Sequence, residues 1–235
     1  MEKHDQQLTG ARLWIGLVLR NSLFAVMLMW PAGTWRWMEA WLLSGLWFLF
    51  SVTVIIFLAH HDPELLRERL KLTPVQKEQP YWDKVLMVFF YAAGLGIFIV
   101  PGLDVMRYGW SEPFSLWIKI TAMLVHLPCY LFLIWVMKAN TYLSPVVKID
   151  EKRGHSVVTT GPYRFVRHPM YSAVIILLFA VPVALGSRFA LIPAFLLAIL
   201  LVLRTYFEDR TLYRELPGYP EYTQKTTYRL LPGIW

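Results

Sequence analysis

Four long apolar segments, each close to the length of a membrane-spanning helix, take up most of the N-terminal part of the chain. They cover approximately residues 13–31, 38–59, 82–103 and 115–137. A helix of about 20 residues crosses the ~30 Å hydrocarbon core of a bilayer, and within that core each backbone polar group must find its partner inside the segment. The four segments therefore predict four transmembrane helices and exclude a soluble fold.

Two further apolar segments, at about 171–186 and 189–206, lie close together near the C-terminus. Each is short for a span and contains a proline, Pro182 in the first and Pro193 in the second. They can form two tilted spans or a helical hairpin that does not fully cross, and in either case the chain returns to the side it left. We therefore expect an all-α, polytopic membrane protein with about five or six transmembrane segments, folded as a single membrane domain over residues 1–235.

The composition agrees with a membrane location, because 57% of the residues are hydrophobic and only 17% are charged, against about 25% charged in soluble domains. Of the 23 Lys and Arg residues, 18 fall in loops on one side of the predicted spans, and the other side receives Arg36, Arg107, Lys119 and Arg188. By the positive-inside rule, both termini and the segment from 138 to 170 face the cytoplasm. The net charge of +7 therefore indicates membrane orientation and not a nucleic-acid partner.

The loop between the second and third spans predicts a short surface helix. Asp62 can cap its N-terminus and Pro63 suits its first position, while Leu65, Leu66 and Leu70 form one apolar edge that we expect to lie on the membrane.

Several tryptophans are expected to anchor the outer side of the protein at the membrane interface. They are Trp30, Trp35, Trp37, Trp41 and Trp110.

No metal site is expected. His60 and His61 are neighbours whose side chains point apart on a helix, and neither a cysteine nor a third histidine lies near them in the sequence. The only cysteine, Cys129, lies within an apolar segment, where a buried packing role suits it better than that of a nucleophile.

The loop after the fourth span contains two segments expected to be extended, 146–149 and 156–160, joined by a charged turn at Asp150 to Gly154. Gly161-Pro162 then breaks the chain.

The polar run from Arg167 to Tyr171 leads into the fifth apolar segment. Pro169 suits the first turn of that helix, so the His168 ring, the Tyr171 hydroxyl and nearby backbone N–H groups are placed at a helix N-terminus at the membrane face. This geometry suits a small polar or anionic ligand. Taken alone, the run is better explained as a basic cap at the membrane edge, with Tyr163 and Tyr171 as interfacial aromatics.

A second polar cluster tips this balance. Glu208 and Asp209 follow the last apolar segment, with Arg204 four residues earlier, and a carboxylate pair beside hydrocarbon is costly unless it has a partner. Because the hairpin returns the pair to the face that carries His168, we predict that the two clusters meet in one pocket.

These residues resemble the isoprenylcysteine carboxyl methyltransferase family of integral membrane methyltransferases, which is related to the phospholipid methyltransferases. The family's Arg-His-Pro-x-Tyr motif corresponds to Arg167 to Tyr171, and its acidic pair to Glu208-Asp209, with Asp209 where the family usually has a second Glu. The resemblance covers roughly 138–235 and includes Gly161-Pro162-Tyr163-Arg164, Leu212, Gly218, Tyr219, Tyr222 and the closing Arg229 to Trp235.

The resemblance implies S-adenosylmethionine as cofactor and a cytoplasmic cofactor-binding region over 138–235. Glu208 and Asp209 would accept hydrogen bonds from the cofactor, His168 and the N–H groups near Gly161 to Tyr163 would donate them, and Tyr171 would pack against it. Arg204 and Glu208 are the predicted catalytic residues; Arg204 would orient an anionic acceptor or form an ion pair with Glu208. The predicted cofactor-binding residues are Gly161, Pro162, Tyr163, Arg167, His168, Pro169, Tyr171, Glu208 and Asp209.

The function that follows is methyl transfer to a lipid-like or membrane-dissolved acceptor, whose acceptor atom belongs to a carboxylate, a thiol or an amine. Two alternatives stay open at the level of sequence: an NADPH-dependent membrane reductase of the steroid and sterol type, and a transporter or scaffold without enzymatic activity. The expected partners are the bilayer and the apolar acceptor, with no nucleic acid and no obligate protein partner.

Overall fold

The computed structural model describes residues 10–70, 79–112, 114–147, 149 and 153–235. Throughout these residues every regular element is helical, which confirms the all-α prediction. The longer helices are α1 (Gly10–Ala32), α2 (Met38–His61), α4 (Tyr81–Pro101), α5 (Leu116–Ala139), α6 (Pro169–Leu185) and α7 (Leu191–Glu215). The shorter elements are α3 (Pro63–Leu70), the π-helix η1 (Gly102–Tyr108), the 3₁₀ turn η3 (Gly161–Arg164) and α8 (Tyr219–Lys225).

Five helices are long and apolar enough to cross a membrane, so the chain is of the integral, multi-pass class. The four N-terminal spans coincide with α1, α2, α4 and α5 within a few residues. The C-terminal hairpin is unequal: α6 has 17 residues and α7 has 25, which correspond to about 25 Å and about 38 Å of helix. The second arm is therefore of spanning length, and the first is shorter than a bilayer core.

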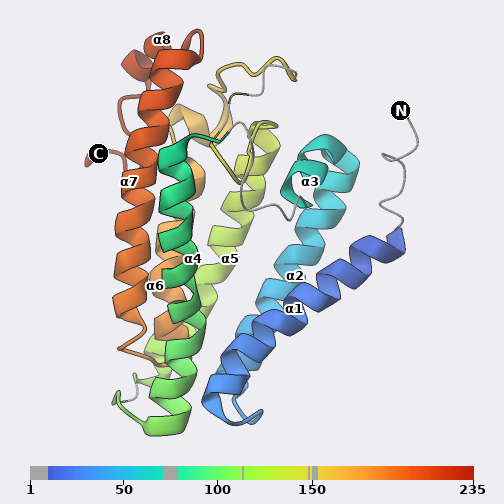
Figure 1. Cartoon of the computed structure of the whole chain (residues 1–235), viewed down its shortest axis with the longest axis vertical. Coiled ribbons are helices and arrows are strands. Elements are labelled where there is room, and N and C mark those ends of the chain that lie inside the picture. Colours follow the sequence, from blue (N-terminus) through green and yellow to red (C-terminus); the bar gives the residue numbers. More distant parts are fainter. Residues whose placement is uncertain (1–9, 71–78, 113, 148, 150–152) are drawn as a thin grey trace.

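The long helices form a bundle in which α4, α5, α6 and α7 run side by side, with α1 and α2 alongside them (Figure 1). The α4 to α7 contact is lined by Ala93, Ile97, Ala194 and Leu197, which are buried together. The start of α6, the end of α7 and the short helices α3 and α8 lie at one end of the bundle (Figure 1). This arrangement brings the two predicted polar clusters to the same end.

The turn between α6 and α7 is fixed at the opposite end by a buried carboxylate. Asp104 of η1 has no exposed surface, and it accepts hydrogen bonds from the Ser187 hydroxyl in the turn and from the Ser111 N–H and hydroxyl. These bonds tie the turn between α6 and α7 to η1 at the end of the bundle away from the two polar clusters.

Two local expectations need correction. The apolar edge of α3 faces the protein and not the membrane, because Leu65 and Leu66 are buried in a cluster with α2 and α5. The predicted cap of this helix is confirmed, since Asp62 Oδ1 accepts a hydrogen bond from the Leu65 N–H at 2.9 Å. Trp37 is only 2% exposed and packs in the core, whereas the other four tryptophans are exposed as expected. The described parts of 146–149 and 156–160, the two segments expected to be extended, contain neither helix nor strand; residues 148 and 150–152 lie outside the described part.

Gly102 allows η1 to pack directly on the backbone of α1. A Cβ at this position would lie 2.7 Å from the Ala32 nitrogen and 2.8 Å from the Leu28 carbonyl oxygen, and backbone atoms cannot yield as a flexible side chain can. We therefore expect Gly102→Ala to lower the stability of the purified protein by about 1–3 kcal/mol. Thermal unfolding in detergent measures this, with Gly94→Ala as control because a Cβ there meets nothing within 4 Å. Equal melting temperatures for the two variants would contradict the close packing.

Candidate active site

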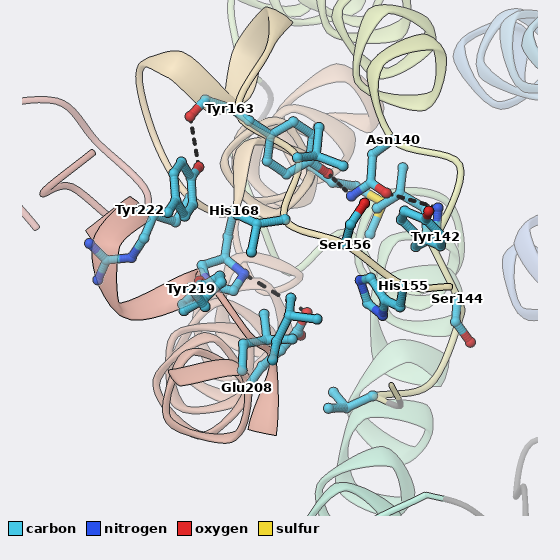
Figure 2. A pocket seen from close by; sticks show the side chains of 18 of the residues that line it. Asn140, Tyr142, Ser144, His155, Ser156, Tyr163, His168, Glu208, Tyr219 and Tyr222 are labelled. Carbon is cyan, nitrogen blue, oxygen red and sulfur yellow. Dashed lines mark hydrogen bonds and ion pairs between the residues drawn. The ribbon is translucent and has the colours of Figure 1, made fainter. Parts of the chain in front are cut away.

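A cleft lies at the end of the bundle where α6 begins and α7 ends its apolar part. The space open to the centre of a water molecule is about 90 Å³, within about 770 Å³ of empty space that includes the open mouth. Figure 2 shows polar and aromatic side chains converging on this space from opposite sides. Of the predicted cofactor-binding residues, those that line it are Tyr163, Arg167, His168, Tyr171 and Glu208.

His168 and Glu208 lie next to each other in the wall of this cleft, although 39 residues separate them in the chain. The His168 Nδ1 lies 3.9 Å from Glu208 Oε1, and the Tyr171 hydroxyl donates to Glu208 Oε2 at 2.6 Å. The His168 and Tyr171 rings lie parallel, with centroids 5.8 Å apart. The predicted meeting of the two clusters is confirmed, and Glu208 presents its carboxylate to the cleft.

The neighbouring acid, Asp209, turns away from the cleft and into a buried network. Its Oδ1 accepts from Arg167 Nε at 2.7 Å and from the Tyr219 hydroxyl at 2.9 Å, and lies 3.4 Å from His168 Nε2. Its Oδ2 accepts from Arg167 at 3.0 Å and from Arg229 Nε at 2.9 Å. A carboxylate offers about four lone-pair directions, so these contacts leave no free acceptor. The geometry replaces the predicted cofactor-accepting role of Asp209 with a structural one.

Arg167 is held in place from both ends of its guanidinium. Besides its two bonds to Asp209, its NH1 donates to the carbonyl oxygens of Thr226 and Thr227, each at 2.8 Å. Burial acts to lower the pKa of this guanidinium, but the hydrogen bonds and charge of Asp209 outweigh burial and raise the pKa above its usual value. Arg167 therefore lines the cleft with a positive charge that the Asp209 carboxylate already compensates.

The backbone beside Arg167 is tied to the C-terminal tail. The N–H of Arg167 donates to the Tyr228 carbonyl at 3.0 Å and that of His168 to the Arg229 carbonyl at 2.9 Å. His168 occupies the N-cap position of α6 without a side-chain capping bond, and Pro169 is the first residue of the helix, as predicted. Pro169 does not line the cleft, and its contribution is to start the helix that carries Tyr171.

Gly161 and Pro162 lie behind the cleft and place Tyr163. Gly161 has a φ of 59°, and a Cβ there would lie 3.0 Å from the Ala139 side chain, so a glycine is required where η3 packs on α5. The N–H of Tyr163 donates to the Thr160 carbonyl within the turn. This N–H group, for which ligand binding was predicted, is therefore already hydrogen-bonded within the protein.

Three tyrosines form much of the fixed wall. The Asn140 side-chain amide donates to the Tyr163 hydroxyl at 2.8 Å, and the Tyr222 hydroxyl donates to the Tyr163 carbonyl at 2.7 Å (Figure 2). Burial raises the pKa of Tyr222 to about 12 and also raises the pKa values of Tyr163 and Tyr219. All three phenols therefore stay protonated, and those of Tyr219 and Tyr222 serve as hydrogen-bond donors at neutral pH.

The opposite wall comes from the loop after α5 and was missed by sequence reasoning. The Tyr142 and His155 rings stack with centroids 4.4 Å apart, and Ser144 and Ser156 lie beside them (Figure 2). Arg153 anchors this loop to α3 through Glu64 at 3.3 Å. The one available signal was the density of polar and aromatic residues directly after the fourth span.

Of the two roles predicted for Arg204, the ion pair with Glu208 is not formed in the described structure. The Arg204 Nε donates to Asp83 of α4 at 2.9 Å, and its NH2 to the Pro145 carbonyl at 2.9 Å. The guanidinium also lies 5.8 Å from the centre of the Tyr171 ring. Arg204 therefore lies behind the cleft wall, one turn of α7 before Glu208, and does not line the cleft itself.

Comparison with known families identifies the segment that contains this site. Residues 120–214 match the sequence model of the Isoprenylcysteine carboxyl methyltransferase (ICMT) family. Over these residues, which are less than half of the chain, the protein is similar to that family. The matched ICMT segment runs from α5 through almost all of α7 and contains His168, Glu208 and Asp209, and the family is one of methyltransferases. Among curated proteins no significant match to the chain was found.

The two adjacent acids should respond differently to loss of charge. Asp209→Asn leaves Arg167 and Arg229 without their shared counter-charge, and breaking a buried ion pair in this way typically destabilises by about 3–5 kcal/mol. We expect a marked fall in thermal stability for this variant and little change for Glu215→Gln, an exposed acid at the end of the same helix. Melting in detergent distinguishes them, and an Asp209→Asn protein as stable as the wild type would show that the network is not structural.

Proposed function

We propose that this protein is an S-adenosylmethionine-dependent methyltransferase that acts on a lipid-like or membrane-dissolved acceptor. The observation that carries the proposal is the Glu208 carboxylate facing His168 at 3.9 Å in an aromatic-walled cleft, inside a segment that matches a methyltransferase family. The lining residues all fall between Asn140 and Tyr222, within the region 138–235 to which we assign cofactor binding.

The chemistry of the cleft fits this cofactor. The amino group, ribose hydroxyls and positive sulfonium of S-adenosylmethionine are suited to carboxylate partners, and its adenine is suited to an apolar or aromatic slot. Glu208 is the cleft's acidic lining residue, since Asp209 is engaged elsewhere, and the stacked Tyr142 and His155 rings supply an aromatic surface. His168 and the serine hydroxyls of the opposite wall can hydrogen-bond the polar edges.

Methyl transfer is an in-line displacement that requires alignment and exclusion of water more than acid or base chemistry. When bound, the cofactor supplies an activated methyl group on its sulfonium. In this chain Tyr171 and His168 fix the Glu208 carboxylate, so that Glu208 can hold its ligand at one place. The protein needs neither a metal nor a covalent intermediate for this step.

The acceptor is proposed to approach from the apolar part of the bundle. Arg204 lies one helical turn closer to the apolar half of α7 than Glu208 does, and it lies behind Tyr171, which lines the cleft. We assign Arg204 the orientation of the acceptor, acting together with the Tyr171 ring that it faces. The acceptor atom is a carboxylate oxygen, a thiol sulfur or an amine nitrogen. The distribution of basic residues supports a cytoplasmic site and cytoplasmic termini.

Removal of the Glu208 charge should weaken cofactor binding without unfolding the protein. Hydrogen bonds to a charged group contribute about 1.5–3 kcal/mol, so Glu208→Gln is expected to raise the dissociation constant for S-adenosylhomocysteine by about 10- to 100-fold. Calorimetric titration of the purified protein measures this. The exposed acid Glu221 of α8 provides the control variant Glu221→Gln, which should bind like the wild type. Wild-type affinity in Glu208→Gln would contradict the assignment.

The activity itself can be tested with membrane lipids. Purified protein, a lipid extract and methyl-labelled S-adenosylmethionine should yield a labelled apolar product that mass spectrometry can identify as an ester, a thioether or a methylated amine. Binding of NADPH in place of S-adenosylhomocysteine would instead indicate a reductase, and binding of neither would remove the basis for the proposal.

A further inference from the structure

Asp83, near the start of α4, is a fully buried acid with three partners from different parts of the chain. Its side chain has no exposed surface. Its Oδ1 accepts from Arg204 Nε at 2.9 Å, while its Oδ2 accepts from the Val147 N–H at 3.1 Å and from the Gln79 side-chain amide at 2.8 Å. An acid with this degree of burial is costly unless its charge is compensated, and Arg204 provides that compensation.

The contacts of Asp83 lead to the cleft along two routes. The first runs through Arg204, whose guanidinium faces the Tyr171 ring, and Tyr171 in turn donates to Glu208 at 2.6 Å. The second runs through Val147, which together with Val146 lines the cleft. Arg204 adds to the second route because it also donates to the Pro145 carbonyl. One buried acid thus fixes both a cationic side chain behind the cleft and a segment of its wall.

Asp83 lies outside the segment that matches the ICMT family, which begins at residue 120. Its distance in sequence from Arg204 is 121 residues. The N-terminal spans therefore contribute to the geometry of a site whose lining residues all come from the C-terminal part of the chain.

We propose that Asp83 is a positioning residue of the methyltransferase site, which holds the Arg204 guanidinium and the Val146–Val147 wall in the arrangement that the acceptor requires. This inference rests on the proposed function. It differs from a purely stabilising role, in which Asp83 would join α4 to α7 and the orientation of Arg204 would not matter for turnover.

A double-mutant cycle on acceptor turnover separates these two roles. Displacement of a positioning group by about 1 Å can lower a rate by about 100-fold, so Asp83→Asn is expected to lower kcat/KM for the acceptor by about that factor. Affinity for S-adenosylhomocysteine should change less than about threefold, because Glu208 and His168 keep their contacts. If Asp83 acts through Arg204, the Asp83→Asn/Arg204→Gln protein should be no less active than Arg204→Gln alone.

A second buried acid supplies the matched control. Asp104 is also fully buried and hydrogen-bonded, but it lies at the opposite end of the bundle, so Asp104→Asn should lower the melting temperature while kcat/KM of the folded fraction stays unchanged. Normal turnover by Asp83→Asn, or losses that multiply in the double variant, would overturn the positioning role while the proposed function stands. A wild-type protein that neither binds S-adenosylhomocysteine nor transfers methyl groups would overturn both.

Discussion

The buried ion pair between Arg167 and Asp209 is the contact around which the end of the bundle is built. Asp209 belongs to α7 and Arg167 to the segment that leads into α6, and Tyr219 of α8 and Arg229 of the tail bind the same carboxylate. Charged groups near hydrocarbon are tolerated only when each is compensated. Because four segments meet at one carboxylate, satisfying that charge also fixes the cleft that lies beside it.

Glu208 and Asp209 are adjacent in the sequence, but helix geometry points their side chains in different directions. Successive residues of an α-helix point about 100° apart, so Glu208 faces the cleft while Asp209 faces the buried network. The shorter Asp side chain suits this place, where its two oxygens receive donors from both arginines and Tyr219. Glu208 has fewer partners, Tyr171 and the more distant His168, which leaves it able to bind a ligand. The acid that is poorly satisfied by the protein is the one proposed to hold the cofactor.

The sequence predicts the spans well because bilayer thickness imposes a length and a composition that single segments reveal. It also predicts that His168 and Glu208 meet, since a hairpin must return to the side from which it started. It fails where the deciding contact is distant in the chain. One of the two roles predicted for Arg204 is an ion pair with Glu208, four residues away, whereas in the structure Arg204 pairs with Asp83, 121 residues away. The sequence also fails to predict the wall that contains Tyr142 and His155. That wall is an irregular loop, and an irregular loop has no periodicity that indicates which side chains converge.

Photo-crosslinking can show whether the cleft lined by His168 and Glu208 holds S-adenosylmethionine. Irradiation of the purified protein with methyl-labelled S-adenosylmethionine, followed by digestion and mass spectrometry, identifies the peptides that contact the ligand. We expect label on peptides from 140–171 or 208–222, and excess unlabelled S-adenosylhomocysteine should remove it. Label that survives this competition, or label confined to peptides around Asp104 and Ser187 at the opposite end of the bundle, would contradict binding in this cleft.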